Sequence, residues 1–454
     1  MNISFENPDK VNGLLTITVE ENDYKENVEK TLKDYRKKAN FPGFRPGMVP
    51  MGMIKKQFGP SVKMDAINKF VGEQIYKYVK DNDVQMLGEP LPSEKQAEAV
   101  DLEKPAPYTF VFDIAVAPEF SIELTDKDQI DYYTIAADDK LIDQQVDALA
   151  SRGGSYEKAE AYDPAQNDML KGDLRELNED GSTKEGGITV ESAVMMPEYI
   201  KVDEEKKHFD GCKLGDIITF NPRKAYPEGE GELTSLLKID REAAKNLTAN
   251  FSFQITEISR FKKAAVDQKL FDDVFGKDTV KSEEEFRARI ADDLKPQLQS
   301  NSDYKFLIDV RKYAEDKVGT LTYPDALLKR VMLLNNKDKG EEFVEKNYDE
   351  SIKQLTWHLI KEQLVKAHNI KVEDADVKEA AKAAARMQFA QYGMNNVPEE
   401  YLENYAAEML KKRENIDNFV DRAVDGKLVV ALKGAMKLNE KSVSLDEFNE
   451  LMKK

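Results

Sequence analysis

The sequence predicts a multidomain α+β protein with a compact α+β segment, a small β-rich segment and a long helical segment. Three observations support this prediction. The chain has 454 residues, more than one ordinary domain holds. Turn-forming residues separate short apolar runs only in the middle of the chain. From about Lys262 onward, apolar residues recur at helical spacing. We expect domain boundaries at 1–117, 118–154, 155–260 and 261–454, the second range being a connector.

The first segment contains the elements of one α+β domain. Apolar residues alternate as in a half-buried strand at Leu15, Ile17 and Val19, and again over residues 108–116. Between these strands we expect a helix capped at Asn22 or Asp23 and a second helix from Ser61. A stretch rich in Gly and Pro, residues 41–50, separates the two helices.

The remaining segments differ in the residues that end helices or form turns. The connector holds one predicted helix that ends at Gly153, and the β-rich segment has turn signals at residues 178–181, 186–187, 210–211 and 227–231. From residue 261 onward we expect an extended all-helical domain, because charged residues surround narrow apolar stripes. That pattern favours long antiparallel arms over a globular bundle. The main helices are expected over residues 282–293, 327–335, 348–368, 376–392, 399–410 and 415–435.

Charge is distributed unevenly along the chain. The net charge of −19 argues against binding of the whole molecule to DNA or to an anionic membrane. Residues 25–63, however, hold ten Lys and Arg against three acidic residues, a local charge of +7 that includes Lys37 and Lys38. This segment indicates either an end that faces RNA or an acidic protein surface, or a solvated helix face.

Compartment and cofactor chemistry are also constrained. One cysteine, Cys212, excludes an internal disulfide and is typical of a reducing compartment. We expect a soluble, cytoplasmic protein, because residues 1–6 do not resemble a targeting signal and no apolar run could span a membrane. The three histidines lack metal-ligand spacing and no phosphate-binding loop is present, so we expect no metal, no cofactor and no use of ATP.

The Gly- and Pro-rich stretch carries the most specific pattern. Its glycines permit a tight loop and its prolines stiffen it, and Phe44 and Arg45 fall at the predicted tip. A rigid, exposed Phe–Arg pair makes a good interface anchor, because Arg binds carboxylate or phosphate and Phe supplies apolar area. An ordinary turn with Phe44 folded inward is the other interpretation.

The motif formed by Gly43, Phe44, Arg45, Gly47 and Pro50 resembles the G-F-R-x-G-x-x-P signature of the trigger factor family. The resemblance extends to the layout of the whole chain: an N-terminal ribosome-docking domain, a connector, an FKBP-like insertion and a helical chaperone domain. It implies an ATP-independent chaperone that binds protein and RNA at the exit tunnel of the large ribosomal subunit. It also implies nascent and unfolded polypeptides as clients and a homodimer when the protein is free. Many members carry Lys where this chain has Pro46, which moves the expected docking charge toward Arg45 and the Lys55/Lys56 region.

The resemblance also implies a peptidyl-prolyl isomerase site in the middle domain, and here the sequence departs from the family pattern. Such a site needs an Asp followed by an aromatic residue, and the corresponding positions of this chain are residues 175–177, which read Arg-Glu-Leu. A further wall position falls near Lys184, and the expected Pro-Gly turn reads Val-Asp-Glu-Glu at 202–205. Tyr226 is the one catalytic candidate, and a core position is its alternative. We therefore expect the fold to persist with weak or absent activity, and the enzyme assignment stays open.

A final stretch, residues 386–394, is rich in Met and aromatic residues. Such side chains adapt to varied partners, so Met387, Phe389, Tyr392 and Met394 are candidates for client binding. Packing between paired helices is the alternative interpretation. For the whole protein, two other functions compete with the ribosome-bound chaperone: an FKBP-type isomerase acting on free unfolded chains, and a ribosome-independent holdase.

Overall fold

The computed structural model describes residues 2–45, 47–96, 100–392, 394 and 397–453. These residues form two compact units. Unit 1 comprises residues 1–132 and 303–441, and unit 2 comprises residues 133–302 and 442–454. Each unit is therefore built from two separate stretches of the chain, and the long helix α9 (Glu283–Val318) contributes to both units.

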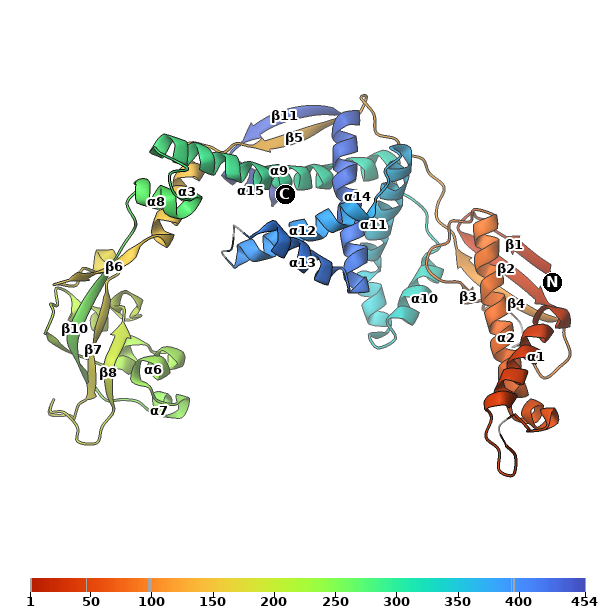
Figure 1. Cartoon of the computed structure of the whole chain (residues 1–454), viewed down its shortest axis with the longest axis horizontal. Coiled ribbons are helices and arrows are strands. Elements are labelled where there is room, and N and C mark those ends of the chain that lie inside the picture. The colour runs from red at the N-terminus through yellow and green to blue at the C-terminus, as the bar shows by residue number, and fades with distance from the viewer. Residues whose placement is uncertain (1, 46, 97–99, 393, 395–396, 454) are drawn as a thin grey trace. The chain divides into compact units, whose positions relative to one another are not determined.

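The N-terminal part of unit 1 is a four-stranded antiparallel sheet with two helices. The sheet order is β1-β2-β4-β3, and Leu15 in β2 is paired with Phe112 in β4. Helix α2 crosses one face of the sheet (Figure 1), and its buried Ile67, Val71 and Ile75 pack on Leu15, Ile17 and Val19. The elements are β1 (Asn2–Glu6), β2 (Asn12–Val19), α1 (Glu21–Lys38), α2 (Met51–Asp81), β3 (Leu91–Pro92) and β4 (Tyr108–Ala115).

Two local expectations for this domain are wrong. Helix α1 is capped by Glu20, not by Asn22 or Asp23, and the Asp23 side chain closes the capping box by accepting from the Glu20 amide. Helix α2 begins ten residues before Ser61, at Met51. Pro60, which normally marks a boundary, lies inside this helix because Ile54 and Phe58 in the added turns pack into their own apolar cluster.

The helical part of unit 1 follows the apolar stripes of the sequence. Its core joins α9, α11 and α14 around Phe306, Val310, Ile360, Leu364 and Leu428. Helix α12 lies beside both α13 and α14 (Figure 1). The helices are α10 (Asp325–Asn335), α11 (Gly340–Ala367), α12 (Asp374–Gln391), α13 (Glu399–Met409) and α14 (Arg413–Ala435).

One strand interrupts the expected all-helical segment. β11 (Lys437–Val443) pairs with β5 (Gln129–Ile135), which lies in the connector. The alternation that predicts a strand is missing from β11, because most of its side chains are exposed. Helix α15 (Leu445–Met452) follows, with Ser444 as its N-cap.

Unit 2 is built around a five-stranded antiparallel sheet. Its order is β6-β10-β7-β8, and β9 also pairs with β10. Ser155 at the start of β6 is paired with Lys262 at the end of β10. The core includes Phe209, Phe220, Phe251 and Phe253, covered by apolar residues of α6 and α7. The strands are β6 (Ser155–Ala159), β7 (Met169–Glu176), β8 (Thr189–Met195), β9 (Ile217–Phe220) and β10 (Phe251–Lys262).

Short helices complete unit 2. Helix α3 (Asp139–Arg152) is the predicted connector helix, and its C-cap is Gly153. It packs with α8 and the first part of α9 around Phe271 and Phe286. The others are α4 (Asp203–Lys206), α5 (Pro222–Ala225), α6 (Glu230–Leu237), α7 (Arg241–Lys245), α8 (Gln268–Phe275) and the 3-10 turns Pro164–Gln166, Pro197–Tyr199 and Lys207–Phe209.

Candidate functional site

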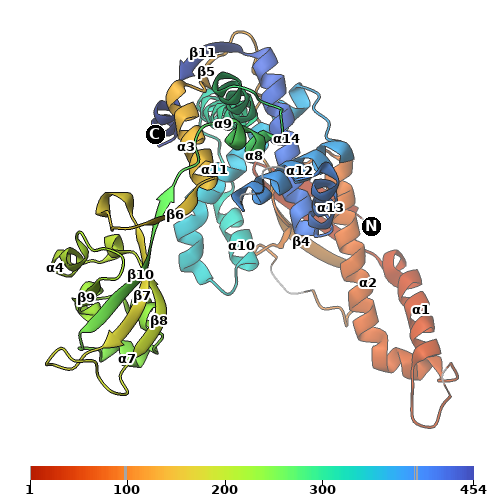
Figure 2. The ribbon, with the colours of Figure 1, turned by 60° about the vertical axis from the view of Figure 1, so that its left-hand side comes forward.

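The Gly- and Pro-rich motif forms a loop between α1 and α2, which we call the tip loop (residues 39–50). Figure 2 shows it at the ends of both helices, on the side away from the sheet. Gly43 and Gly47 have φ values of +89° and +83°, a conformation that L side chains rarely adopt, so the loop requires glycine at both positions. Pro50 is the N-cap of α2, with φ at −58°. Pro46 lies outside the described residues.

Phe44 and Arg45 are presented at the turn of this loop. The Phe44 amide donates to the Phe41 carbonyl at 3.1 Å, and the Met48 amide donates to the Arg45 carbonyl at 2.9 Å. These bonds fix the backbone while the side chains stay outside, with Phe44 38% exposed. Among the described residues Arg45 has no ion-pair partner. The loop therefore combines a half-exposed aromatic ring with an unpaired permanent cation.

Basic residues surround the tip loop. Lys37, in the last turn of α1, pairs with Asp34 at 2.8 Å, and this hydrogen bond holds the pKa of Asp34 below its usual value. Lys38, Lys55 and Lys56 are exposed, and none has an acidic partner in the part of the chain that the structure describes. The structure thus brings the predicted Lys37 and Lys38 to the loop together with two lysines from the first turns of α2.

An apolar cluster lies beneath the loop, which we call the tip cluster: Leu32, Val49, Ile54 and Val62. It is distinct from the core between α2 and the sheet. Phe58 extends the cluster, since its ring stacks on Tyr35 with 5.1 Å between centroids and meets Phe41 edge-on at 6.2 Å. Sequence reasoning missed Phe58, because this helix was expected to begin after it.

Tyr226, the one catalytic candidate of the middle domain, lies in the core of that domain, which is the alternative that the sequence left open. Tyr226 is 6% exposed within the core, where burial raises its pKa to about 12. Phe209, Phe220 and Phe253 fill the same core. Tyr226 therefore occupies the interior of the domain together with these rings.

Two charged residues at the expected pocket positions bind each other. Lys184 Nζ donates to Glu176 Oε1 at 2.6 Å, and the Ile188 amide donates to Glu176 Oε2 at 2.9 Å. The bond from Lys184 outweighs burial and holds the pKa of Glu176 below its usual value. A carboxylate with these partners is ionised at neutral pH, so this end of β7 carries a charged pair where an isomerase pocket would need apolar walls.

Cys212 is buried in the same domain. Burial, with a smaller effect from Asp216, raises the pKa of its thiol to about 11. At neutral pH the side chain is therefore a thiol and not the nucleophilic thiolate. It acts here as a small core residue.

The Met- and aromatic-rich stretch lies at the end of α12 and just after it; we call Met387, Phe389, Tyr392 and Met394 the arm-tip patch. Met387, Tyr392 and Met394 are exposed, Tyr392 to 75%. Phe389 is half-buried and its ring lies 5.2 Å from that of Tyr405 in α13. Sequence reasoning missed Tyr405 and the exposed Tyr401, whose spacing of four residues on α13 was the available signal. The stretch thus combines helix packing at Phe389 with exposed apolar groups around it.

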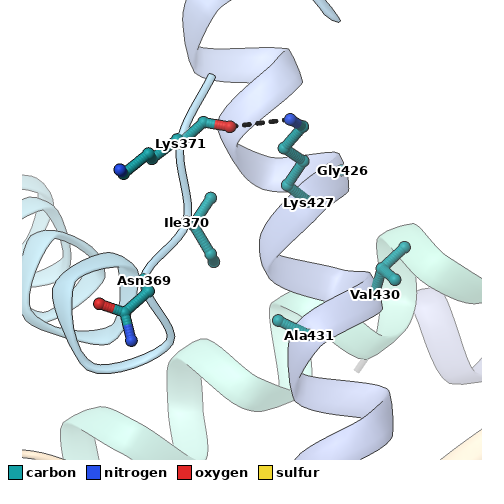
Figure 3. A pocket seen from close by; sticks show the side chains of 7 residues that line it. All are labelled: Asn369, Ile370, Lys371, Gly426, Lys427, Val430 and Ala431. Carbon is teal, nitrogen blue, oxygen red and sulfur yellow. Dashed lines mark hydrogen bonds between the residues drawn. The ribbon is translucent and has the colours of Figure 1, made fainter. Parts of the chain in front are cut away.

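A second apolar surface lies beside α14. An open hollow of about 540 Å³ is lined by Ile370, Val430 and Ala431, with Asn369, Lys371, Gly426 and Lys427 around it (Figure 3). Lys427 Nζ donates to the Lys371 carbonyl at 2.7 Å and pairs with Asp376, which holds the rim in place. Val430 is 73% exposed, so its side chain adds apolar area at the surface of this hollow.

The described ranges contain no candidate for a metal site and none for a membrane-spanning helix. No group of three His, Cys, Asp or Glu side chains there is placed to hold a metal ion. Among the helices of those residues, none combines the length and apolar character that a bilayer crossing requires.

Comparison with known proteins gives a consistent result along the chain. The family model "Bacterial trigger factor protein (TF)" matches residues 1–149. "Probable trigger factor, FKBP-like domain" matches residues 156–263, and "Probable trigger factor, C-terminal domain" matches residues 302–452.

Curated relatives match over most of their length. A trigger factor of Chlorobaculum tepidum is 25% identical over 387 residues, 82% of this chain and 84% of its own. One of Pelagibacter ubique is 21% identical over 460 residues, 100% of this chain and 89% of its own.

A solved structure titled "Promiscuous Substrate Recognition in Folding and Assembly Activities of the Trigger Factor Chaperone" shares the fold. Its TM-score is 0.51 at 15% identity, over 95% of this chain and 99% of that one. The three domain models follow each other in order and leave residues 150–155, 264–301 and 453–454 unmatched. The chain therefore belongs to the trigger factor family of chaperones.

Proposed function

We propose that this protein docks at the exit tunnel of the large ribosomal subunit through its tip loop and shelters emerging polypeptides. The observation that carries the proposal is the exposed pair Phe44 and Arg45 on a backbone-fixed loop, beside Lys38, Lys55 and Lys56, which have no acidic partner among the described residues. Ribosomal RNA offers phosphates to these cations, and an apolar recess on a tunnel-exit protein offers a place for Phe44. The work takes place in the cytoplasm, where ribosomes are found.

Co-sedimentation with non-translating ribosomes tests this docking. The wild-type protein should pellet with ribosomes, and a Phe44→Ala/Arg45→Ala variant should stay in the supernatant. A Tyr76→Ala/Lys77→Ala variant is a matched control, since it removes an exposed aromatic ring and a cation from α2, outside the tip loop. If the wild-type protein fails to pellet even at low salt, the docking proposal is wrong and a ribosome-independent holdase takes its place.

Client binding is the second part of the proposal. The arm-tip patch and the hollow beside α14 place exposed apolar groups on two separate elements of the helical domain. Dispersed patches of this kind give weak, broad affinity for unfolded chains, because each contact is apolar and non-directional. Release of a client then needs only folding of the client, without a nucleotide. A homodimer of the free protein belongs to the same proposal and is tested by sedimentation velocity.

For the middle domain we propose a binding role with weak prolyl isomerisation. Isomerisation requires a desolvated aromatic pocket, whereas the aromatic rings here fill the core and Glu176 and Lys184 are charged. A protease-coupled prolyl peptide assay measures the activity directly. Uncatalysed prolyl isomerisation takes tens of seconds or more. Turnover well above that rate would establish the isomerase function instead.

A further inference from the structure

The tip loop is held to α1 by one side chain that the sequence motif does not include. Arg36 Nε donates to the Val49 carbonyl at 2.9 Å, and the Arg36 carbonyl accepts from the Gly47 amide at 3.2 Å. Both bonds are made to the part of the loop that leads into α2, one at Gly47 and one at Val49. One residue of α1 therefore fixes the backbone that follows Phe44 and Arg45.

The same contacts place Val49 in the tip cluster. Val49 is fully buried against Leu32 and Ile54, although it lies in a loop rich in Gly and Pro. The apolar side chains of the cluster cannot donate a hydrogen bond to the Val49 carbonyl, whereas Arg36 does so. Burial of Val49 and the bond from Arg36 thus support each other.

The positive charge of Arg36 is not used in an ion pair within the described residues. Its guanidinium has no ion-pair partner there, and the side chain is half-buried whereas its neighbours Lys37 and Lys38 are exposed. A cation used mainly for long-range attraction would be exposed like those lysines. The half-buried placement fits a hydrogen-bond donor that acts on the loop backbone.

We propose that Arg36 is a positioning residue for docking: it holds the tip loop in the conformation that presents Phe44 and Arg45. The proposal rests on the docking function proposed above. Preorganisation of this kind raises affinity because the loop loses less conformational freedom on binding.

Two neutral substitutions separate positioning from charge. Arg36→Gln places an amide nitrogen at the same number of bonds from Cα as Nε, so it keeps the donor to Val49. Arg36→Met has a similar length but no donor. Both variants lose the same charge, and thermal unfolding of each checks that the domain stays folded. Lys33→Gln, on an exposed turn of α1, measures the effect of losing one charge alone.

Two readouts are needed. Ribosome affinity should fall by about tenfold in Arg36→Met relative to Arg36→Gln, the loss of one hydrogen bond from a preorganised contact. Hydrogen exchange of the Gly47 amide, measured on the free protein, should be faster in Arg36→Met than in Arg36→Gln. Arg36→Gln should bind like Lys33→Gln.

Other outcomes overturn the proposal. Equal weakening in the Gln and Met variants means that Arg36 acts through its charge, and wild-type affinity in both means that it has no role in docking. The exchange measurement stands apart from the ribosome. If the wild-type protein does not bind ribosomes, the docking function fails, and equal Gly47 exchange in the two variants would independently refute the hold of Arg36 on the loop.

Discussion

Gly172 lies where β7 and β10 approach each other closely. A Cβ added at this residue would lie 2.2 Å from the Gln254 carbonyl oxygen, a backbone atom that cannot rotate away. Gly172→Ala should therefore destabilise the middle domain by about 1–3 kcal/mol or more, the usual cost of overpacking. Urea unfolding followed by tyrosine fluorescence or circular dichroism measures the change.

Gly231 provides the matching control in the same domain. It lies in α6, and no atom would come within 4 Å of an added Cβ. Gly231→Ala should raise stability by up to about 1 kcal/mol through helix propensity. Equal effects from the two substitutions would show that the close approach at Gly172 is not what limits the residue there.

Asp128 ties the connector to α9 and gives a prediction for pH. Its buried side chain accepts from Lys317 Nζ at 2.6 Å, Tyr313 Oη at 2.8 Å and the Thr125 amide at 2.8 Å. Burial alone would raise the pKa of this carboxyl, but the three donors together hold it below its ordinary value of 3.8. The ionised form is therefore the one that the fold favours.

The sign of the pH dependence follows from that direction. Because the folded pKa lies below the unfolded one, the contribution is complete above pH 3.8 and is lost as pH falls through the folded value. Asp128→Asn should cost about 1–3 kcal/mol near neutral pH, and its difference from wild type should shrink in acid. Urea midpoints across this range test it, with the exposed Asp126→Asn as control. A difference that persists unchanged into acid would contradict the assignment.

At the scale of elements, the α12–α13 pair carries the prediction for client binding. Met387→Ser/Tyr392→Ser removes exposed apolar area without touching the buried Ala381 and Ala406 between the helices. Suppression of aggregation of an unfolded model protein, followed by light scattering, should weaken several-fold if hot-spot side chains dominate. Tyr76→Ser, an exposed tyrosine of the N-terminal domain, should leave it unchanged. An equal loss in the control would mean that total exposed apolar area, and not this patch, governs binding.

The elements also show how far the sequence could predict this structure. Apolar periodicity located α10 to α14 to within a few residues at most boundaries, except that α11 begins earlier, at Gly340. It missed β5 and β11, because strands that pair across some three hundred residues carry little local signal when one of them is mostly exposed. It also began α2 too late, since tertiary packing of Ile54 and Phe58 overrides the break expected at Pro60.

The candidate site divides in the same way. The tight loop that carries Phe44 and Arg45 could be predicted from the sequence, because the φ values that Gly43 and Gly47 permit are local properties of the loop. The hydrogen bond from Arg36 to the Val49 carbonyl could not be predicted, because the two residues are 13 positions apart in the sequence and meet only once the loop folds back on α1. The interior position of Tyr226 was one of the two alternatives that the sequence left open, and residues of α6 belong to the same core cluster.

At the scale of the whole molecule, charge separates the tip from the rest. The chain carries −19 overall, yet residues 25–63 carry +7. Ribosomal phosphates should attract the tip and repel the remainder, so that the molecule approaches in one orientation. Binding to ribosomes should weaken with salt, because neutralised phosphates release counterions.

Two variants separate the terms of this binding. Lys55→Gln/Lys56→Gln should reduce the slope of log affinity against log salt by about 1–2, up to one for each phosphate that the variant no longer neutralises. Phe44→Ala should lower affinity at every salt concentration and leave the slope unchanged. Ribosome co-sedimentation over a salt series gives both quantities. A slope that changes with Phe44 but not with the lysines would reverse these roles.

The pairing of Ser155 with Lys262 has a consequence for how this protein can be taken apart. The middle domain begins and ends on neighbouring strands, so its two junctions with the rest of the chain lie about 5 Å apart, the spacing of paired Cα atoms. Two or three glycines can bridge that gap. We therefore expect that the middle domain can be deleted without leaving a long gap in the chain. A different binding domain whose termini are adjacent could be inserted at the same junction.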